Sequence, residues 1–259
     1  MKKILAVGNI IAFLATVAFN YISNTGAING NTMSTISAKY ENLFTPAGYA
    51  FSIWGLIYLM LFGFVVYQSF TLFGHRRPGK AVAKVGIWFI VSCIANISWI
   101  FAWLNEYIGL SVMVMLLLLF SLIIIILRGR LELDDESLPV IAFFWWPFTF
   151  YSGWITVALI ANIAAFLTAE GWSGFGISEV AWTIIMIVAA GLINLVITWT
   201  RNMREFALVG AWGLAAVAVA NWDKHQSIVI AGIAIAGILL LSTAIHGFKN
   251  RNTAPWTKL

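Results

Sequence analysis

The chain has 259 residues, of which 61% are hydrophobic and only 10% are charged. A soluble domain has about 45–50% apolar and about 25% charged residues, so one core of this size cannot hide the excess of apolar side chains. The composition excludes a soluble enzyme, a disordered chain and a secreted disulfide scaffold, and it predicts an all-α, polytopic integral membrane protein. The single cysteine, Cys93, excludes an intrachain disulfide and a cysteine-rich metal site.

Eight segments that lack Asp, Glu, Lys and Arg are long enough to be transmembrane helices. A helix needs about 20 apolar residues to cross a hydrocarbon core about 30 Å thick. Strands are not expected, because the segments lack the alternating pattern of membrane-barrel strands. The seventh segment is the shortest and is rich in alanine and glycine. The eight helices are expected near residues 4–22, 47–73, 83–104, 108–127, 139–167, 179–199, 206–222 and 227–247.

Lys2 and Lys3 precede the first apolar segment, which is the arrangement found in signal peptides. A signal peptide also needs a small-residue cleavage site after the apolar run, and Asn20 and Tyr21 stand where that site would be expected. We therefore expect that the first helix is retained in the membrane.

Lysine and arginine residues are distributed unequally between the two sides of the expected helices. Only Lys39 and Lys224 fall on one side, and by the positive-inside rule the other side, which carries both termini, is cytoplasmic. The basic residues are scattered among the loops, so we expect the lipid bilayer as a partner and no nucleic acid. The residues on the cytoplasmic side are Lys2, Lys3, Arg76, Arg77, Lys80, Lys84, Arg128, Arg130, Arg201, Arg204, Lys249, Arg251 and Lys258.

Ionisable residues are missing from the interior of the expected helices, although Lys84 stands at the end of one. Proton and ion pumps normally need such residues, so the sequence disfavours an ion-coupled transporter. The acidic run at residues 132–136 falls in a cytoplasmic loop and predicts a solvated turn, not a metal site. No combination of nucleophile, base and orienting residue is recognisable, so no catalytic residue is predicted.

Aromatic residues and a proline gather where the second expected helix begins. The segment from Phe44 to Tyr58 reads FTPAGYAFSIWGLIY. It resembles the signature of the tryptophan-rich sensory protein (TspO) family, which includes the mitochondrial translocator protein, also called the peripheral benzodiazepine receptor. The family usually has a second proline where Ala47 stands in this chain.

Two later blocks are similar to the family in order and spacing. Asn96 and Trp99 in the third expected helix resemble an Asn-x-x-Trp pattern, and Trp154 and Asn162 in the fifth keep the family's interval of eight residues. The resemblance covers about residues 1–168, which we interpret as a five-helix ligand-binding bundle. Residues 169–259 are expected to add three transmembrane helices and a short cytoplasmic tail.

The resemblance implies a pocket that opens to the outer side and is closed by the long first outer loop, residues 23–46. Family members bind apolar ligands such as porphyrins and sterols, which implies a porphyrin or haem-type tetrapyrrole first and a sterol-like lipid second, with no required cofactor. It also implies a homodimer and, from the bacterial members, a bacterial plasma membrane. The residues expected to contact the hydrophobic ligand are Tyr49, Phe51, Trp54, Asn96, Trp99, Trp154, Ala158 and Asn162.

The residue types themselves are compatible with such a pocket. Aromatic faces stack on a planar ring, and a few polar groups orient a ligand in an apolar site. Trp154 and Ala158 lie one helical turn apart, so the small side chain leaves a slot beside the indole. The alternative is structural: aromatic rows often only pack, and an asparagine such as Asn162 can simply hydrogen-bond a neighbouring helix.

Two other classes of function stay open from the sequence. One is a transporter or facilitator of a small or lipidic solute that uses all eight helices. The other is a membrane enzyme that modifies a porphyrin or a lipid, which the resemblance implies for some bacterial members. The leading hypothesis is a protein that binds a hydrophobic ligand and then transports or senses it.

Overall fold

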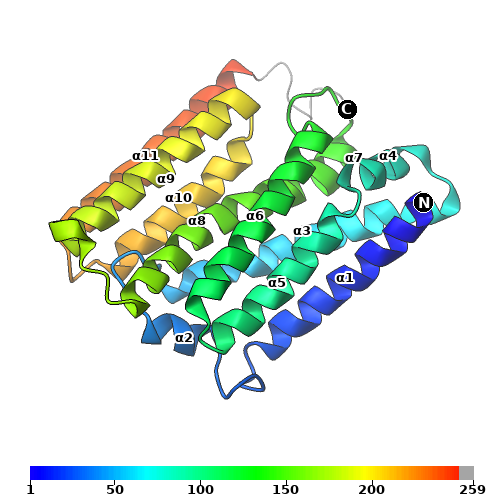
Figure 1. Ribbon diagram of the computed structural model, residues 1–259. Helices are drawn as coiled ribbons and strands as arrows, with labels where there is room; N and C mark the ends of the chain where they lie inside the picture. Colours follow the sequence, from blue (N-terminus) through cyan, green and yellow to red (C-terminus); the bar gives the residue numbers. More distant parts are fainter. Residues whose placement is uncertain (251–259) are drawn as a thin grey trace.

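The computed structural model describes residues 1–250, which form a bundle of long helices (Figure 1). The all-α prediction is confirmed for these residues, which contain no named β-strand. Arg251 and Lys258, which contribute to the predicted orientation, lie outside the described residues. The helices are α1 (Lys2–Ile22), α2 (Met33–Lys39), η1 (Gly48–Ser52), α3 (Ile53–Ser69), η2 (Phe70–Phe73), α4 (Arg76–Val85), α5 (Trp88–Leu104), α6 (Ile108–Gly129), α7 (Leu138–Val140), η3 (Ile141–Trp145), α8 (Trp146–Ala169), η4 (Gly174–Gly176), α9 (Glu179–Arg201), α10 (Arg204–Ala220) and α11 (Gln226–Lys249).

The predicted count of eight spans is not confirmed. Six helical segments among the described residues are long and apolar enough to cross a bilayer, and there are seven if α4 and α5 form one broken span. Each predicted segment does coincide with a helical segment, but α10 has only 17 residues. At about 1.5 Å per residue it is shorter than a hydrocarbon core of about 30 Å. Most of α10 is buried, and it packs against α8, α9 and α11.

α4 and α5 meet at an angle of 54°, because the chain changes direction at Gly86. Gly86 has a φ of 59°, a left-handed value that favours glycine. α4 is amphipathic: Val82 and Val85 are buried, whereas Lys80 is exposed. Lys84 donates a hydrogen bond to the Gly129 carbonyl at the end of α6 (3.1 Å). This bend places the basic helix at the end of the bundle where α1 begins.

The start of α8 is irregular because of Pro147. Proline lacks a backbone N–H and cannot continue a regular helix from the preceding turn. The residues before it, Ile141–Trp145, form one π-helical turn (η3), which admits an extra residue before α8 continues. The turn buries Phe144 and Trp145.

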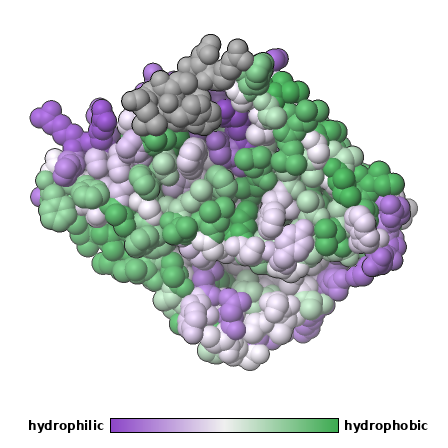
Figure 2. Space-filling model, turned by 180° about the vertical axis from the view of Figure 1, so that it is seen from behind, coloured by the Kyte–Doolittle hydropathy of each residue, from purple (hydrophilic) through white to green (hydrophobic). Residues whose placement is uncertain are grey.

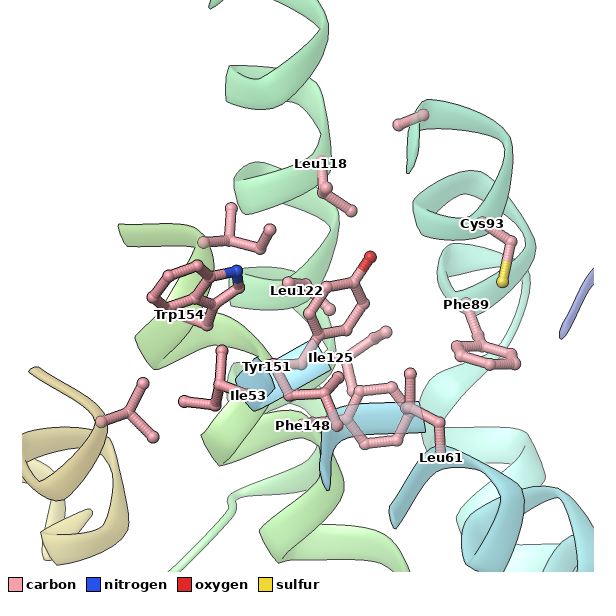
Figure 3. Packing of buried hydrophobic residues seen from close by; sticks show 14 of the residues in the cluster. Ile53, Leu61, Phe89, Cys93, Leu118, Leu122, Ile125, Phe148, Tyr151 and Trp154 are labelled. Carbon is pink, nitrogen blue, oxygen red and sulfur yellow. The ribbon is translucent and has the colours of Figure 1, made fainter. Parts of the chain in front are cut away.

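The main apolar core lies between α1, α3, α5, α6 and α8 (Figure 3). Its inner part is an aromatic cluster in which the Phe148 ring lies 4.9 Å from Phe64 and 5.7 Å from Phe89, both edge-on. Tyr151 and Trp154 continue the same face of α8 toward the other end of the bundle (Figure 3). α8 is therefore the element around which the core is arranged.

The outer surface of the bundle is as apolar as a lipid-facing surface requires. Hydrophobic residues cover most of the middle of the face shown in Figure 2, and hydrophilic residues gather toward its margins. Many large apolar side chains are exposed, including Leu59 on α3 and Leu241 on α11. Such extensive exposure is unusual for a soluble protein but matches contact with lipid. This surface agrees with integral membrane localisation.

α9, α10 and α11 pack closely on the first helices through α8 (Figure 1). A Cβ atom on Gly213 of α10 would lie 2.7 Å from Val157 Cγ1 of α8, so this contact depends on the absence of a side chain. Gly210 allows the same close approach to Asn194 of α9. Small residues at helix contacts are typical of membrane proteins, because van der Waals packing drives their association.

Candidate functional site

The segment that carries the aromatic signature forms η1 and the first turns of α3. Pro46 precedes η1, and the backbone N–H of Ala47 donates to the Ala216 carbonyl of α10 (3.0 Å). The indole N–H of Trp212, also on α10, donates to the Ala50 carbonyl (3.2 Å). These two bonds fix the direction in which α3 begins, and α10 therefore positions the signature residues.

A cavity of about 730 Å³ opens between η1, α1 and the outer loop. Its apolar wall is formed by Phe51, Trp54, Tyr58 and Trp99. Figure 2 shows that the surface is hollowed near its lower margin, at the end of the bundle to which α2 belongs. The remaining lining residues come mostly from α1, from α2 and from the loop that follows it: Val17, Asn20, Tyr21, Asn24, Met33, Ser34, Ser37, Ala38, Glu41, Thr45, Pro46, Ala47, Gly48 and Ala220.

A narrow slot of about 60 Å³ continues this cavity into the bundle. Trp154 and Ala158 of α8 line the slot, and Trp54 and Trp99 line both the slot and the wider cavity. Asn162, also on α8, lines the slot as well. The short Ala158 side chain lies one turn from Trp154, so the structure contains the space that this spacing suggests.

Trp54 is the centre of the aromatic wall. Its ring stacks on Tyr58 with a centroid distance of 5.3 Å and an interplanar angle of 19°. It also meets Tyr151 at 5.7 Å and Trp154 at 6.5 Å, both edge-on. Phe51 contacts Trp154 edge-on at 6.1 Å. These contacts fix the ring of Trp54 before a ligand arrives, so little side-chain entropy is lost on binding.

Two hydrogen-bonding groups, one in the aromatic wall and one in the slot, are buried without a partner among the described residues. They are the Tyr58 hydroxyl and the Trp154 indole N–H. Trp154 is only 1% exposed. A buried donor without an acceptor costs free energy, about 1–3 kcal/mol. A ligand that places an acceptor atom in the slot would remove this cost.

Asparagine side chains behind the wall connect the helices. Asn162 accepts a hydrogen bond from the Trp99 indole N–H (2.7 Å) and donates to Ser111 Oγ (2.8 Å). Asn96 accepts from Asn20 Nδ2 (2.8 Å) and donates to the Tyr151 hydroxyl (3.0 Å). Asn162 lines the slot, whereas Asn96 is fully buried and lines neither space. Asn96 thus holds the helices together behind the site.

Of the eight residues expected to contact the ligand, two, Asn96 and Tyr49, line neither the cavity nor the slot. Tyr49 points toward α10, where its ring lies edge-on to Trp212 at 5.2 Å. The other six line the cavity or the slot: Phe51, Trp54, Trp99, Trp154, Ala158 and Asn162. Their contact with a ligand stays a prediction.

The outer loop covers the cavity and is attached on its α5 side. α2 begins with a reciprocal capping arrangement of Thr32 and Thr35. Lys39 forms an ion pair with Glu106, and the Tyr40 hydroxyl donates to the same carboxylate (2.8 Å). The hydrogen bond from Lys39, followed by that from Tyr40, lowers the pKa of Glu106 below its ordinary value. The expected lid is therefore an ordered, tethered segment.

The same loop is attached on its other side to α10. Lys224 pairs with Glu41 (2.7 Å), and Asn221 Nδ2 donates to the Leu43 carbonyl (2.9 Å). Ala220, the last residue of α10, lines the cavity. The site thus draws on residues beyond 168, although its aromatic wall comes from the first five expected helices.

Several residues of the site were not predicted from the sequence as ligand contacts. Tyr58 and Trp103 each follow a chosen tryptophan by one helical turn, so helical spacing could have indicated them. Asn20 on α1 and Met33 and Ser37 on α2 carry no such signal, because only the packing of α1 and the outer loop around the cavity brings them to it.

Comparison with known proteins assigns the chain to a family. A family model described as a TSPO-like protein matches residues 4–245. This match includes α9 and α10 and most of α11, beyond residue 168 where the resemblance in the sequence ended. No curated protein and no solved structure matches the chain. The chain, with its apolar helices and its aromatic cavity, therefore belongs to the TSPO-like protein family.

Proposed function

We propose that the chain binds a hydrophobic, largely planar ligand in the cavity under the outer loop. The observation that carries this proposal is the aromatic wall of Phe51, Trp54, Tyr58 and Trp99, which faces a space of about 730 Å³. Ligand pockets are typically about 300–1,000 Å³ and are lined by aromatic side chains with a few polar groups. A planar ring system gains most from such a wall, because it buries apolar area against several faces and edges.

The proposed ligand is a tetrapyrrole first and a sterol-like lipid second. Both are apolar enough for the wall, and the resemblance to the family favours the tetrapyrrole. The unpartnered Trp154 N–H supports a ligand with an acceptor atom at its inner edge. Glu41, an acidic residue of the lining, is paired with Lys224, so its negative charge is already compensated.

Titration of the purified full-length protein with protoporphyrin IX tests this proposal. We expect a saturable shift of the Soret band together with quenching of tryptophan fluorescence, at one ligand per chain. Competition by cholesterol would show that a sterol occupies the same site. Porphyrin binding that never saturates, with no displacement by cholesterol and no saturable sterol binding, would contradict a defined hydrophobic site.

The second candidate is transport of the same ligand. It is favoured by the position of α10, which borders the cavity through Ala220 and holds both η1 and the outer loop. Movement of α10 would change the lining and the lid together. Uptake of protoporphyrin IX into vesicles containing the protein, compared with empty vesicles, separates transport from binding alone.

A further inference from the structure

A second cavity, of about 550 Å³, lies at the opposite end of the bundle, where α11 ends. It is enclosed by the loop after α6, the start of α8, the start of α10 and the last turns of α11. None of its lining residues belongs to the aromatic cavity under the outer loop. The two cavities are therefore separate sites that share no lining residue.

Two half-buried carboxylates in this cavity each have one oxygen atom that lacks a hydrogen-bond partner. Oε1 of Glu132 and Oε2 of Glu205 are inaccessible to solvent and have no partner among residues 1–250. No basic nitrogen of these residues forms an ion pair with either carboxylate. The sequence predicted a solvated turn at 132–136; the segment does form a turn, but Glu132 is only partly exposed and its Oε1 is inaccessible to solvent. Leu131 is fully buried, and Glu132, with a φ of 61°, turns toward the bundle.

The environment of Glu132 opposes its negative charge. Burial, and then the negative charge of Glu205, raise the pKa of Glu132 to about 8, although the positive charge of Arg204 acts in the opposite direction. The other charged or titratable groups of the lining are the acidic residues 134–136 and His246 on α11. Arg204 rests against Gly247 of α11, where its Nη1 would lie 3.5 Å from an added Cβ.

Unpartnered neutral donors also line this cavity. Trp145, in the π-helical turn, is 2% exposed, and its indole N–H has no hydrogen-bond partner among the described residues. The Thr243 hydroxyl on α11 is likewise buried without a partner. Trp146 adds a second indole to the lining. Buried polar groups are normally satisfied in folded proteins, so the unpartnered oxygens of Glu132, Glu205 and Thr243, which can all accept hydrogen bonds, point to a missing donor ligand.

The charges of the lining decide what kind of ligand fits. Five acidic residues and one arginine face the cavity, so an anion is disfavoured. The described residues contain no group of three or more acidic, histidine or cysteine side chains that could hold a metal ion. A cation placed near Glu132 and Glu205 would satisfy both carboxylates, and the indole faces of Trp145 and Trp146 attract cations. We propose that this cavity binds an organic cation, a primary amine or guanidinium group carried on an apolar body.

Three compounds with closely related skeletons test the proposal by isothermal titration calorimetry on the full-length protein in a non-ionic detergent. They are 3-phenylpropylamine, which is cationic, 3-phenylpropanol, which is neutral, and 3-phenylpropionate, which is anionic. We expect saturable binding of the amine and at least tenfold weaker binding of the other two. Equal binding of all three, or no saturable binding of the amine, would overturn the proposal.

Two variants locate the binding. Glu132→Gln and Glu205→Gln keep the side-chain size and remove one charge each, so both should fold and should weaken amine binding at least tenfold. Glu170→Gln, at the exposed end of α8, is the matched control and should leave the affinity for the amine unchanged. Unchanged amine affinity in both cavity variants would show that the amine binds elsewhere.

Proton release provides a readout that a change in folding would not imitate. A bound cation favours the ionised form of Glu132, so amine binding near pH 7 should release protons. Titrations in buffers of different ionisation enthalpy measure this release. It should disappear in Glu132→Gln and persist in Glu170→Gln. Binding without proton release in the unmodified protein would contradict a direct contact between the amine and Glu132.

Discussion

Trp99 donates its indole N–H to Asn162 Oδ1 across 2.7 Å and thereby joins α5 to α8 behind the aromatic cavity. Both residues are buried, and Asn162 in turn donates a hydrogen bond to Ser111 Oγ of α6. One side chain thus links three helices at the inner wall of the site. The shape of the slot beside Trp154 depends on this link, because Trp99 and Asn162 both line it.

Replacing Asn162 by alanine should lower the stability of the bundle. The substitution leaves the Trp99 donor and the Ser111 hydroxyl without their partner, and single interhelical hydrogen bonds in membranes contribute about 0.6–2 kcal/mol. The free energy of unfolding in detergent is the measurement. Asn105→Ala, which removes a bond only to the backbone of its own helix, is the control. A loss no larger than in the control would show that the link is energetically unimportant.

The close packing of α10 on α8 should be sensitive to a single methyl group. A Cβ atom at residue 213 would overlap Val157, so Gly213→Ala should destabilise the protein by about 1–3 kcal/mol. Gly237→Ala on α11 is the matched control, because no atom lies within 4 Å of the added Cβ. Thermal unfolding of the two variants measures the difference. Equal melting temperatures would mean that α10 sits loosely against α8.

The ion pair at Glu106 should hold the outer loop closed. Glu106→Gln removes the acceptor that attracts Lys39, so hydrogen exchange in residues 31–42 should become faster at neutral pH, whereas Glu170→Gln should not change it. The pKa of Glu106 is lowered in the folded protein, so the tether is fully present above about 4.5, its ordinary value, and is lost as the pH falls through the lowered pKa. The difference between the original protein and Glu106→Gln should therefore vanish in acid. A difference that persists there would assign the effect to something other than the charge.

The orientation in the membrane stays a prediction from the distribution of basic residues. In a Cys93→Ser background, Ala27→Cys on the outer loop should react with a membrane-impermeant maleimide in intact cells. Lys80→Cys on α4 should react only after the cells are opened. Both positions are exposed in the structure, so access to the reagent is decided by the membrane alone. The reverse labelling pattern would invert the topology.

The sequence predicted the positions of the long helices well, because apolar length and gaps between charges report directly on helices in lipid. It could not settle the number of spans, because α10 is short and is buried by its neighbours. It indicated the aromatic wall through Phe51, Trp54 and Trp99, whose helical spacing follows from local structure. It could not show that Asn96 lies outside the lining of the cavity or that one carboxylate oxygen of Glu132 is buried, because both depend on contacts between distant segments.

The most direct test of the account compares protoporphyrin IX affinity in Trp54→Ala and Trp222→Ala with that of the unmodified protein. Trp54 borders both the cavity and its slot, whereas Trp222 is 58% exposed beyond the end of α10. Removing the stacking face of Trp54 should weaken binding by about tenfold to a hundredfold, which corresponds to about 1.4–2.8 kcal/mol. Trp222→Ala should bind as the unmodified protein does. Equal affinities in both variants, whether reduced or unchanged, would contradict a ligand site built around Trp54.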